Sequence, residues 1–222
     1  MAKESFLSST IGRKIVVSLT GFFLISFLVV HVSINSTLLL GDRGETFNIA
    51  SHFMAYNWVI RIMEVGLFLG FIIHIIMTLR LYFENRSKRP VKYTMTNQQA
   101  NSKWYSRSMT LLGTLLLIFL VIHISDFWAE KLVHIYYRGE EVKDYYTHVK
   151  TSLSQWYNLL IYIGAFVALG YHLLHGFPSA FQTLGLNHKK YTPLIKFLGT
   201  AFSIIVPALF AAIALALFFD LV

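Results

Sequence analysis

Five apolar stretches, each long enough to cross a lipid bilayer as a helix, constrain this chain more than any other feature of its sequence. A hydrocarbon core of about 30 Å needs about 20 helical residues. The first stretch contains no Asp, Glu, Lys or Arg, and the fifth contains none between Lys196 and Asp220. The sequence therefore predicts an all-α integral membrane protein, a single domain built as a bundle of five transmembrane helices. The predicted helices cover 15–40, 58–81, 108–128, 156–180 and 194–219.

The composition excludes a soluble domain and any cysteine-based metal site. Only 14% of the residues are charged, against about 25% in a typical soluble domain. The net charge of +8 does not indicate nucleic-acid binding, because the basic residues lie in short segments between the apolar stretches. The sequence contains no cysteine, so a redox metal would have to be held by histidine or methionine.

The distribution of Lys and Arg predicts the orientation of the bundle. With a cytoplasmic N-terminus, the inner segments carry 13 basic and two acidic residues, and the outer segments carry six basic and nine acidic residues. Basic residues gather on the cytoplasmic side of membrane proteins. We therefore expect the N-terminus inside and the C-terminus outside. The basic inner segment 80–107 could also dock an acidic partner or anionic membrane lipid, or it could reflect topology alone.

Five of the nine histidines lie inside the predicted helices, where an ionisable residue is costly and is a candidate functional residue. His31 and His123 lie about 16 residues from the inner ends of the first and third helices, which places them in the outer half of the bundle. His74 and His172 lie 16 residues from the outer ends of the second and fourth helices, which places them in the inner half. At 1.5 Å per residue, these depths predict two layers roughly 12–18 Å apart. The fifth histidine is His175.

A bis-histidine haem explains two histidines in each layer. Haem b takes two axial imidazoles and needs no cysteine, whereas a single zinc or copper ion would need three or four ligands at one point. The absence of a C-x-x-C-H motif argues against c-type haem. The sequence thus predicts two haem b groups, the outer held by His31 and His123 and the inner by His74 and His172. The alternative is a set of structural, hydrogen-bonded histidines.

His175 lies three residues after His172 and shares much of its helix face, so it is an alternative inner ligand. His172 matches the depth of His74, and Gly176 leaves space on its face for a flat macrocycle. His175 would then contact a haem propionate, relay a proton or form an interfacial hydrogen bond.

Four further polar residues lie near the outer layer and are candidates for a quinone site. Arg61 and Glu64 are spaced for an ion pair on one face of the second helix, and this pair is either structural or a route for protons at the site. Asn35 and Asp126 follow His31 and His123 by one helical turn, and they either cap polar groups or contact the substrate.

These residues resemble the di-haem cytochrome b membrane anchor of succinate:quinone oxidoreductases, the succinate dehydrogenases and fumarate reductases with a single five-helix anchor. The resemblance covers nearly the whole chain. It rests on SSTIGRKIVVSLTGFFLISFLVVH at 8–31, HFM at 52–54, one histidine in each of the first four helices, and YHLLHGFPSAFQTLG at 171–185. In that family the first and third helices hold the outer haem and the second and fourth hold the inner haem. The resemblance therefore implies the same ligand pairs as the histidine depths.

The resemblance also implies the function and the partners of the chain. A flavoprotein subunit and an iron–sulfur subunit would bind at the cytoplasmic face of a bacterial cytoplasmic membrane. The chain would pass electrons between the iron–sulfur subunit and a quinone, expected to be menaquinone, and would itself carry no catalytic residue for succinate chemistry. Some fumarate reductases of the family have a glutamate beside the ligand on the fourth helix. The fourth predicted helix here has no acidic residue.

Two alternatives remain open at this point. The first is the cytochrome b anchor of another membrane oxidoreductase, such as a hydrogenase or a formate dehydrogenase. The second is a haem-free, proton-coupled transporter whose buried histidines relay protons. Such a transporter would be expected to show repeated or discontinuous half-helices, and the sequence shows no strong sign of them.

Overall fold

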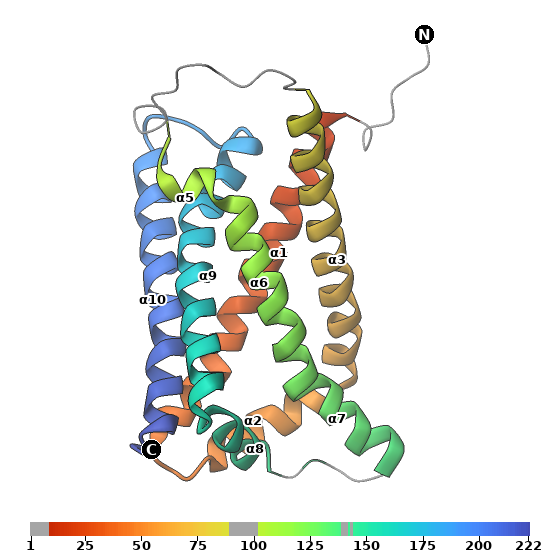
Figure 1. Cartoon of the computed structure of the whole chain (residues 1–222), viewed down its shortest axis with the longest axis vertical. Coiled ribbons are helices and arrows are strands. Elements are labelled where there is room, and N and C mark those ends of the chain that lie inside the picture. Colours follow the sequence, from red (N-terminus) through yellow and green to blue (C-terminus); the bar gives the residue numbers. More distant parts are fainter. Residues whose placement is uncertain (1–8, 89–101, 139–141, 143) are drawn as a thin grey trace.

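The computed structural model describes residues 9–88, 102–138, 142 and 144–222, and all the regular structure within these ranges is helical. Five helices are long and apolar enough to cross a membrane, which confirms the predicted fold class (Figure 1). Four of them are α1 (Thr10–Ser36), α3 (Trp58–Ser87), α9 (Trp156–Thr183) and α10 (Thr192–Phe218). The fifth runs over Met109–Arg138 and comprises α6 (Met109–His123), η3 (Ile124–Ala129), α7 (Glu130–Leu132) and η4 (Val133–Arg138).

Short elements cover the two ends of the bundle (Figure 1). At one end lie η2 (Thr37–Leu40), α2 (Glu45–Tyr56) and α8 (Tyr145–Leu153), together with the C-terminal residues; we call this the α8 end. At the opposite end lie α5 (Trp104–Arg107) and the start of α1, and we call this the α5 end. If the predicted orientation is right, the α8 end is the outer end.

The membrane-spanning helices are longer than their apolar stretches, because polar side chains stabilise their ends. α1 begins at Thr10, five residues before the predicted start at residue 15. The Ser9 hydroxyl caps this start by accepting from the Gly12 N–H at 3.0 Å. At the same end of the bundle, α3 continues to Ser87 rather than residue 81, and Glu84 on this extension forms an ion pair with the largely buried Arg13. Hydropathy alone does not detect such polar extensions.

The predicted end of the third helix, at Trp128, was wrong. The helix passes through the π-helical turn η3 and continues to Arg138, the end of a second π-helical turn, η4. The apolar pattern of the sequence ends before the charged residues Glu130 and Lys131, which is why the helix was predicted to end there. Both residues nevertheless belong to the helical segment α7. Lys131 stays within the helix because its ammonium group reaches a carboxylate on α3. π-Helical turns are rare and frequently occur at functional sites.

Helix packing is tightest around α9 and α10, which carry most of the buried residues of the spans. α1 packs against α3, α9 and α10, and α6 packs against α9. The backbone of α3 packs mainly against α1 and α2. Many large apolar side chains on the other helix faces are exposed, as expected for surfaces that contact lipid.

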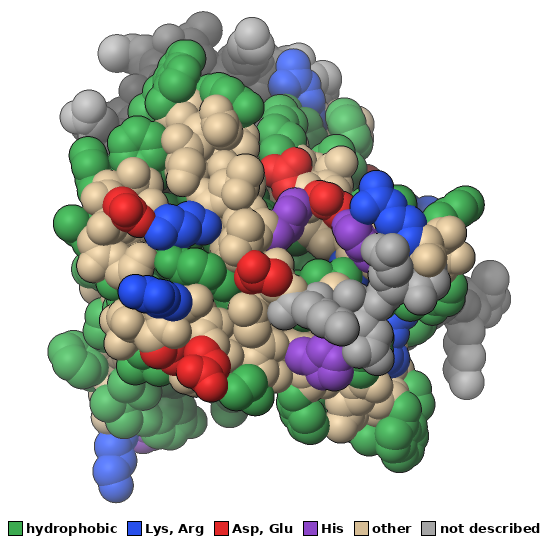
Figure 2. All heavy atoms as spheres, turned by 90° about the horizontal axis from the view of Figure 1, so that it is seen from below, with side chains coloured by type: hydrophobic (Ala, Val, Ile, Leu, Met, Phe, Trp, Pro, Cys, Tyr) green, Lys and Arg blue, Asp and Glu red, His purple; other side chains and the backbone are tan. Residues whose placement is uncertain are grey.

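The elements at the α8 end form a cap with its own apolar core. Leu38, Phe47 and Leu153 pack there against Leu217 near the end of α10. The Asn48 side chain joins α2 to α8, because its Oδ1 accepts from the Tyr146 N–H at 2.9 Å. Asp144 caps α8, and hydrogen bonds from Thr147 hold the pKa of this carboxyl below its ordinary value. Figure 2 looks onto this end and shows acidic, basic and histidine side chains gathered there.

Replacing Gly44 with Ala is expected to destabilise this cap. Gly44 precedes α2 with a φ of 80°, a left-handed conformation that L side chains rarely adopt, and a Cβ there would overlap the ring of Tyr146. We expect a loss of about 2–3 kcal/mol in the free energy of unfolding, from backbone strain and from displacement of Tyr146. Thermal melting in detergent measures it. Gly41→Ala is the control, because Gly41 is also left-handed (φ 69°) but has free space around its Cβ position. Equal losses in both variants would contradict a role for the Tyr146 contact.

Candidate cofactor and quinone sites

The structure brings His31 and His123 together toward the α8 end of the bundle. His31 lies on the part of α1 nearest this end, and His123 is the last residue of α6. Their ring centroids are 5.8 Å apart and their planes are inclined by 83°. Two imidazoles on opposite sides of one metal have ring centres about 6 Å apart, because each metal–nitrogen bond is about 2 Å long. The spacing of the two rings therefore suits ligation of one metal ion between them.

Aromatic side chains surround the His31–His123 pair. Phe27 stacks on His31 with centroids 5.3 Å apart, and Phe119 stacks on His123 at 5.5 Å. The hydroxyl of the buried Tyr162 lies 3.2 Å from Nδ1 of His123. Metal-bound histidines usually donate the second ring N–H to a nearby acceptor, which fixes the ring. Tyr162 is such an acceptor for His123.

The contacts of His74 suit the tautomer with a proton on Nδ1. Its Nδ1 lies 3.1 Å from Oγ1 of Thr20 on α1. The Thr20 hydroxyl also lies 2.8 Å from Val16 O and 3.1 Å from Val17 O, the carbonyls one turn back, to which it can donate its single proton. With that proton so placed, the Thr20 oxygen accepts from the Nδ1–H of His74. In this tautomer Nε2 of His74 keeps its lone pair, the form that ligates a metal.

His172 has a buried nitrogen without a partner in the part of the chain that the structure describes. This atom is Nδ1, and a buried unpaired polar atom is costly. The His172 ring lies close enough to His74 for the two to interact electrostatically. A glycine on the neighbouring helix faces each ring: a Cβ at Gly21 would lie 3.6 Å from Cε1 of His74, and one at Gly113 would lie 4.0 Å from Cε1 of His172. Side chains larger than alanine at either glycine would meet these rings.

His175 is hydrogen-bonded to α5, with its Nδ1 2.7 Å from the Ser106 hydroxyl. This contact is the kind of hydrogen bond that the sequence predicted for His175. It leaves Nε2 of His175 free, so the alternative of His175 as the inner ligand stays open.

The residues at both levels fit a bis-histidine haem. Each level has two imidazoles from different helices, and no described group of three or more His, Asp or Glu side chains could hold a metal ion by itself. The donor set is therefore suited to a porphyrin, which supplies four of the six iron ligands itself. The unpaired nitrogen of His172 and the glycines beside the inner rings are further features of this fit.

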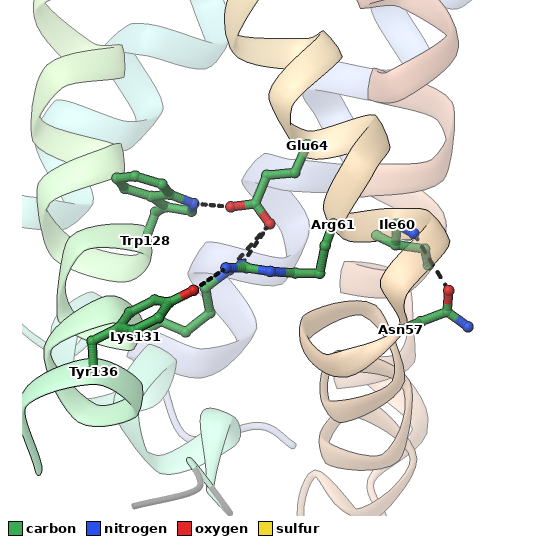
Figure 3. A network of polar contacts seen from close by, with 7 residues as sticks. All are labelled: Asn57, Ile60, Arg61, Glu64, Trp128, Lys131 and Tyr136. Atoms are coloured by element: carbon green, nitrogen blue, oxygen red, sulfur yellow. Dashed lines mark hydrogen bonds and ion pairs between the residues drawn. The ribbon is translucent and has the colours of Figure 1, made fainter. Parts of the chain in front are cut away.

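A polar network centred on Glu64 lies toward the α8 end of α3 (Figure 3). Glu64 Oε2 accepts from Arg61 at 2.9 Å and from Lys131 at 3.5 Å. Glu64 Oε1 accepts from the indole N–H of Trp128. Arg61 also donates to the hydroxyl of Tyr136 at 3.3 Å. The network thus joins α3 to η3, α7 and η4. It places one carboxylate between two cations, so its net charge is positive.

A cavity of about 440 Å³ adjoins this network. Its polar lining is Arg61, Glu64, Trp128 and Tyr136, and its apolar lining comprises Ile62, Val65, Phe68 and Leu132. Binding sites for small molecules are commonly cavities of about 300–1,000 Å³ with mostly apolar walls and a few polar groups. The cavity can therefore accept a flat, largely apolar molecule with a polar end.

The comparisons with known proteins give no family. No protein-family model, curated protein or solved structure matches the chain. The function of the chain is therefore inferred from the histidine pairs, from the cavity beside Glu64 and from the sequence resemblance.

The four quinone-site candidates do not form one cluster. Arg61 and Glu64 line the cavity, whereas Asn35 and Asp126 do not. The Asn35 amide donates to the carbonyl of His31 at 2.8 Å and lies 3.5 Å from its Nδ1. The backbone carbonyl of Asp126 lies 2.9 Å from Nε2 of His148, which also pairs with Glu130. A part for Asn35 or Asp126 in quinone binding stays a prediction.

Three residues of the Glu64 network were not predicted from the sequence to belong to a polar site. Trp128 has the pattern of an interfacial anchor, while Lys131 and Tyr136 lie beyond the predicted end of the third helix. One signal was available: Lys131 follows Trp128 by three residues, so a helix continuing past Trp128 would place both on one face. Tyr136 could not be assigned in this way, because the π-helical turn η4 changes the helical phase before it.

Proposed function

We propose that this chain is the di-haem cytochrome b subunit that anchors a succinate dehydrogenase or fumarate reductase and passes electrons between its iron–sulfur subunit and membrane menaquinone. Among its residues, His31 and His123 would hold the outer haem b, and His74 and His172 the inner one. Haem iron supplies a reversible one-electron couple, which allows transfer between one-electron iron–sulfur centres and a two-electron quinone.

The observation that carries the haem part of this proposal is the pairing of histidines from four membrane-spanning helices at two levels. The succinate or fumarate partner rests on the resemblance of the sequence. The 5.8 Å spacing of the His31 and His123 rings supports the outer site, and the unpaired Nδ1 of His172 supports the inner site. The protein's own contribution is to fix the rings: Tyr162 orients His123, and Thr20 orients His74 in the tautomer with a free Nε2. Aromatic stacking around His31 and His123 keeps water from the outer pair.

We place the proposed quinone site at the cavity beside Arg61 and Glu64. Support comes from its apolar walls, its polar rim and its position toward the same end of the bundle as the outer histidine pair. The Arg61–Glu64–Lys131 cluster carries a net positive charge. This charge favours the electron-rich carbonyl oxygens of a quinone.

Optical spectroscopy of the purified chain tests the haem proposal. The chain, expressed with an adequate haem supply and purified in mild detergent, is expected to contain two protohaems in the pyridine haemochrome assay. Its dithionite-reduced spectrum should show sharp low-spin α-bands. A folded chain that binds no haem under these conditions would contradict the proposal and favour the proton-coupled transporter.

Co-purification then tests the catalytic partners. From the native membrane we expect the chain to bring with it a flavoprotein and an iron–sulfur protein with succinate:quinone reductase or quinol:fumarate reductase activity. A di-haem chain that instead brings a nickel or molybdenum enzyme would assign it to a hydrogenase or formate dehydrogenase.

A further inference from the structure

The Tyr136 hydroxyl donates its proton to no residue in the described part of the chain. It accepts a hydrogen bond from Nη2 of Arg61 at 3.3 Å. A phenol has one proton to donate as well as lone pairs to accept with, and no described residue takes the Tyr136 proton in a hydrogen bond. Tyr136 lines the cavity of about 440 Å³, and its side chain is 69% exposed. The Tyr136 O–H is therefore a free hydrogen-bond donor at the edge of the cavity, as far as the described residues show.

Glu64 and Trp128, two of the other polar groups of the cavity, cannot donate freely to a ligand. The ionised Glu64 only accepts, Oε2 from Arg61 and Lys131 and Oε1 from Trp128. The indole N–H of Trp128 is its only donor, and Glu64 occupies it. Arg61 uses one N–H on Glu64 and one on Tyr136, and both bonds hold its guanidinium in the network. Tyr136 can bind a ligand without any change in the network.

Arg61 makes Tyr136 a better donor and holds it in place. A hydroxyl that accepts from a guanidinium becomes polarised, and its own O–H becomes a stronger donor. Arg61 is itself fixed by Glu64 at 2.9 Å, and Glu64 is fixed by Lys131 and Trp128. Figure 3 shows this sequence of contacts running from α3 to Tyr136 on η4.

From this geometry we propose that Tyr136 binds the quinone by donating a hydrogen bond to one of its carbonyl oxygens, and that Arg61, Glu64, Lys131 and Trp128 act as positioning residues for that phenol. This proposal rests on the proposed quinone-reactive function. In this arrangement Tyr136 touches the substrate, and Glu64 acts through Arg61. The ring of the quinone would lie among Ile62, Val65, Phe68 and Leu132.

The test compares Tyr136→Phe with Tyr137→Phe in the purified, haem-loaded complex. Both variants lose one phenolic hydroxyl, but Tyr137 is 88% exposed and does not line the cavity. The probe is 2,3-dimethyl-1,4-naphthoquinone, with its succinate-dependent reduction as the assay. We expect Tyr136→Phe to raise the KM for the naphthoquinone about three- to tenfold, the loss typical of one hydrogen bond, with haem content and kcat within twofold of wild type. Tyr137→Phe should retain the wild-type KM.

Infrared difference spectroscopy measures the hydrogen bond directly, through the carbonyl stretching frequency of the bound naphthoquinone. This frequency would not change if Tyr136 had only a structural role. The carbonyl stretch of bound, ¹³C-labelled naphthoquinone should lie at higher frequency in Tyr136→Phe than in the wild type, because a donor has been removed. If Tyr136→Phe fails to assemble, the wild-type complex can still overturn the inference: a carbonyl that accepts a hydrogen bond must show a stretch that responds to exchange from H₂O into D₂O.

The outcomes separate this inference from the function on which it rests. A wild-type KM and carbonyl stretch in Tyr136→Phe, or equal KM changes in both variants, would overturn the role of Tyr136 while leaving the quinone function intact. An assembled wild-type complex that binds two haems but does not reduce the naphthoquinone would overturn both. In the wild-type fallback experiment, a carbonyl stretch that does not respond to D₂O would overturn the inference alone.

Discussion

The chain with Leu in place of His31 is expected to bind one haem b, against the two expected for the wild-type chain. Leucine fills a similar volume but offers no lone pair, so the outer iron would lose one of its two axial ligands. The inner site should be retained, because its histidines lie on α3 and α9. The measurement is haem per chain by pyridine haemochrome, with the reduced spectrum resolved into its two α-band components. His52→Leu is the control: this histidine lies on α2, outside the spans, and both haems should remain.

The same experiment extends to the pairing of the ligands. His123→Leu should remove the same spectral component as His31→Leu, whereas His74→Leu and His172→Leu should remove the other one. His175→Leu should retain both components, because His172, which matches the depth of His74 in the sequence, is the expected inner ligand. Retention of two low-spin haems after the loss of His31 would show that the assignment of the outer ligand is wrong.

Glu64→Gln is expected to lower stability and quinone reduction together. Glutamine keeps the shape and one acceptor oxygen, but it leaves the Arg61 and Lys131 cations without a counter-charge in a partly buried site. Hydrogen bonds to charged groups contribute about 1.5–3 kcal/mol each, so we expect a loss of about 2 kcal/mol in the free energy of unfolding. The melting temperature in detergent should fall by about 4–8 °C. At naphthoquinone concentrations below the KM, its reduction should fall by no more than the roughly three- to tenfold expected for Tyr136→Phe, because Arg61 would no longer hold Tyr136 in place.

A surface carboxylate on the same side of the bundle provides the control. Glu45 lies in the first turn of α2, and Glu45→Gln should leave melting and quinone reduction near their wild-type values. If Glu64→Gln retained wild-type activity with lowered stability, the network would be only structural. If both properties were retained, the carboxylate charge would have no role in the network.

The membrane spans could be predicted because apolar length alone determines them, but their ends could not. The helices extend into polar sequence wherever side chains find partners, as Arg13 does with Glu84 and Lys131 does with Glu64. Hydropathy carries no information about such partners. The prediction of Trp128 as the end of the third helix failed for this reason.

The pairing of His31 with His123 could be predicted from their depths, because every helical residue adds the same rise. Which residues face a given histidine depends instead on how each helix is rotated against its neighbours. Thr20 beside His74 and Tyr162 beside His123 could therefore not be identified from the sequence. The cavity at Glu64 also depends on where α7 and η4 lie in space, and no spacing in the sequence reports that position.

The π-helical turn η3 lies between His123 and Lys131 along one continuous helix, and it contains Trp128. A π-helical turn holds about one residue more than an α-helical turn, so it can absorb the loss of one residue by reverting to α-helix. Such a deletion at 124–127 would leave His123 in its position and Lys131 still facing α3, because the missing residue is taken from the π-helical turn. The helix can thus change its length by one residue at η3 in evolution without losing either site.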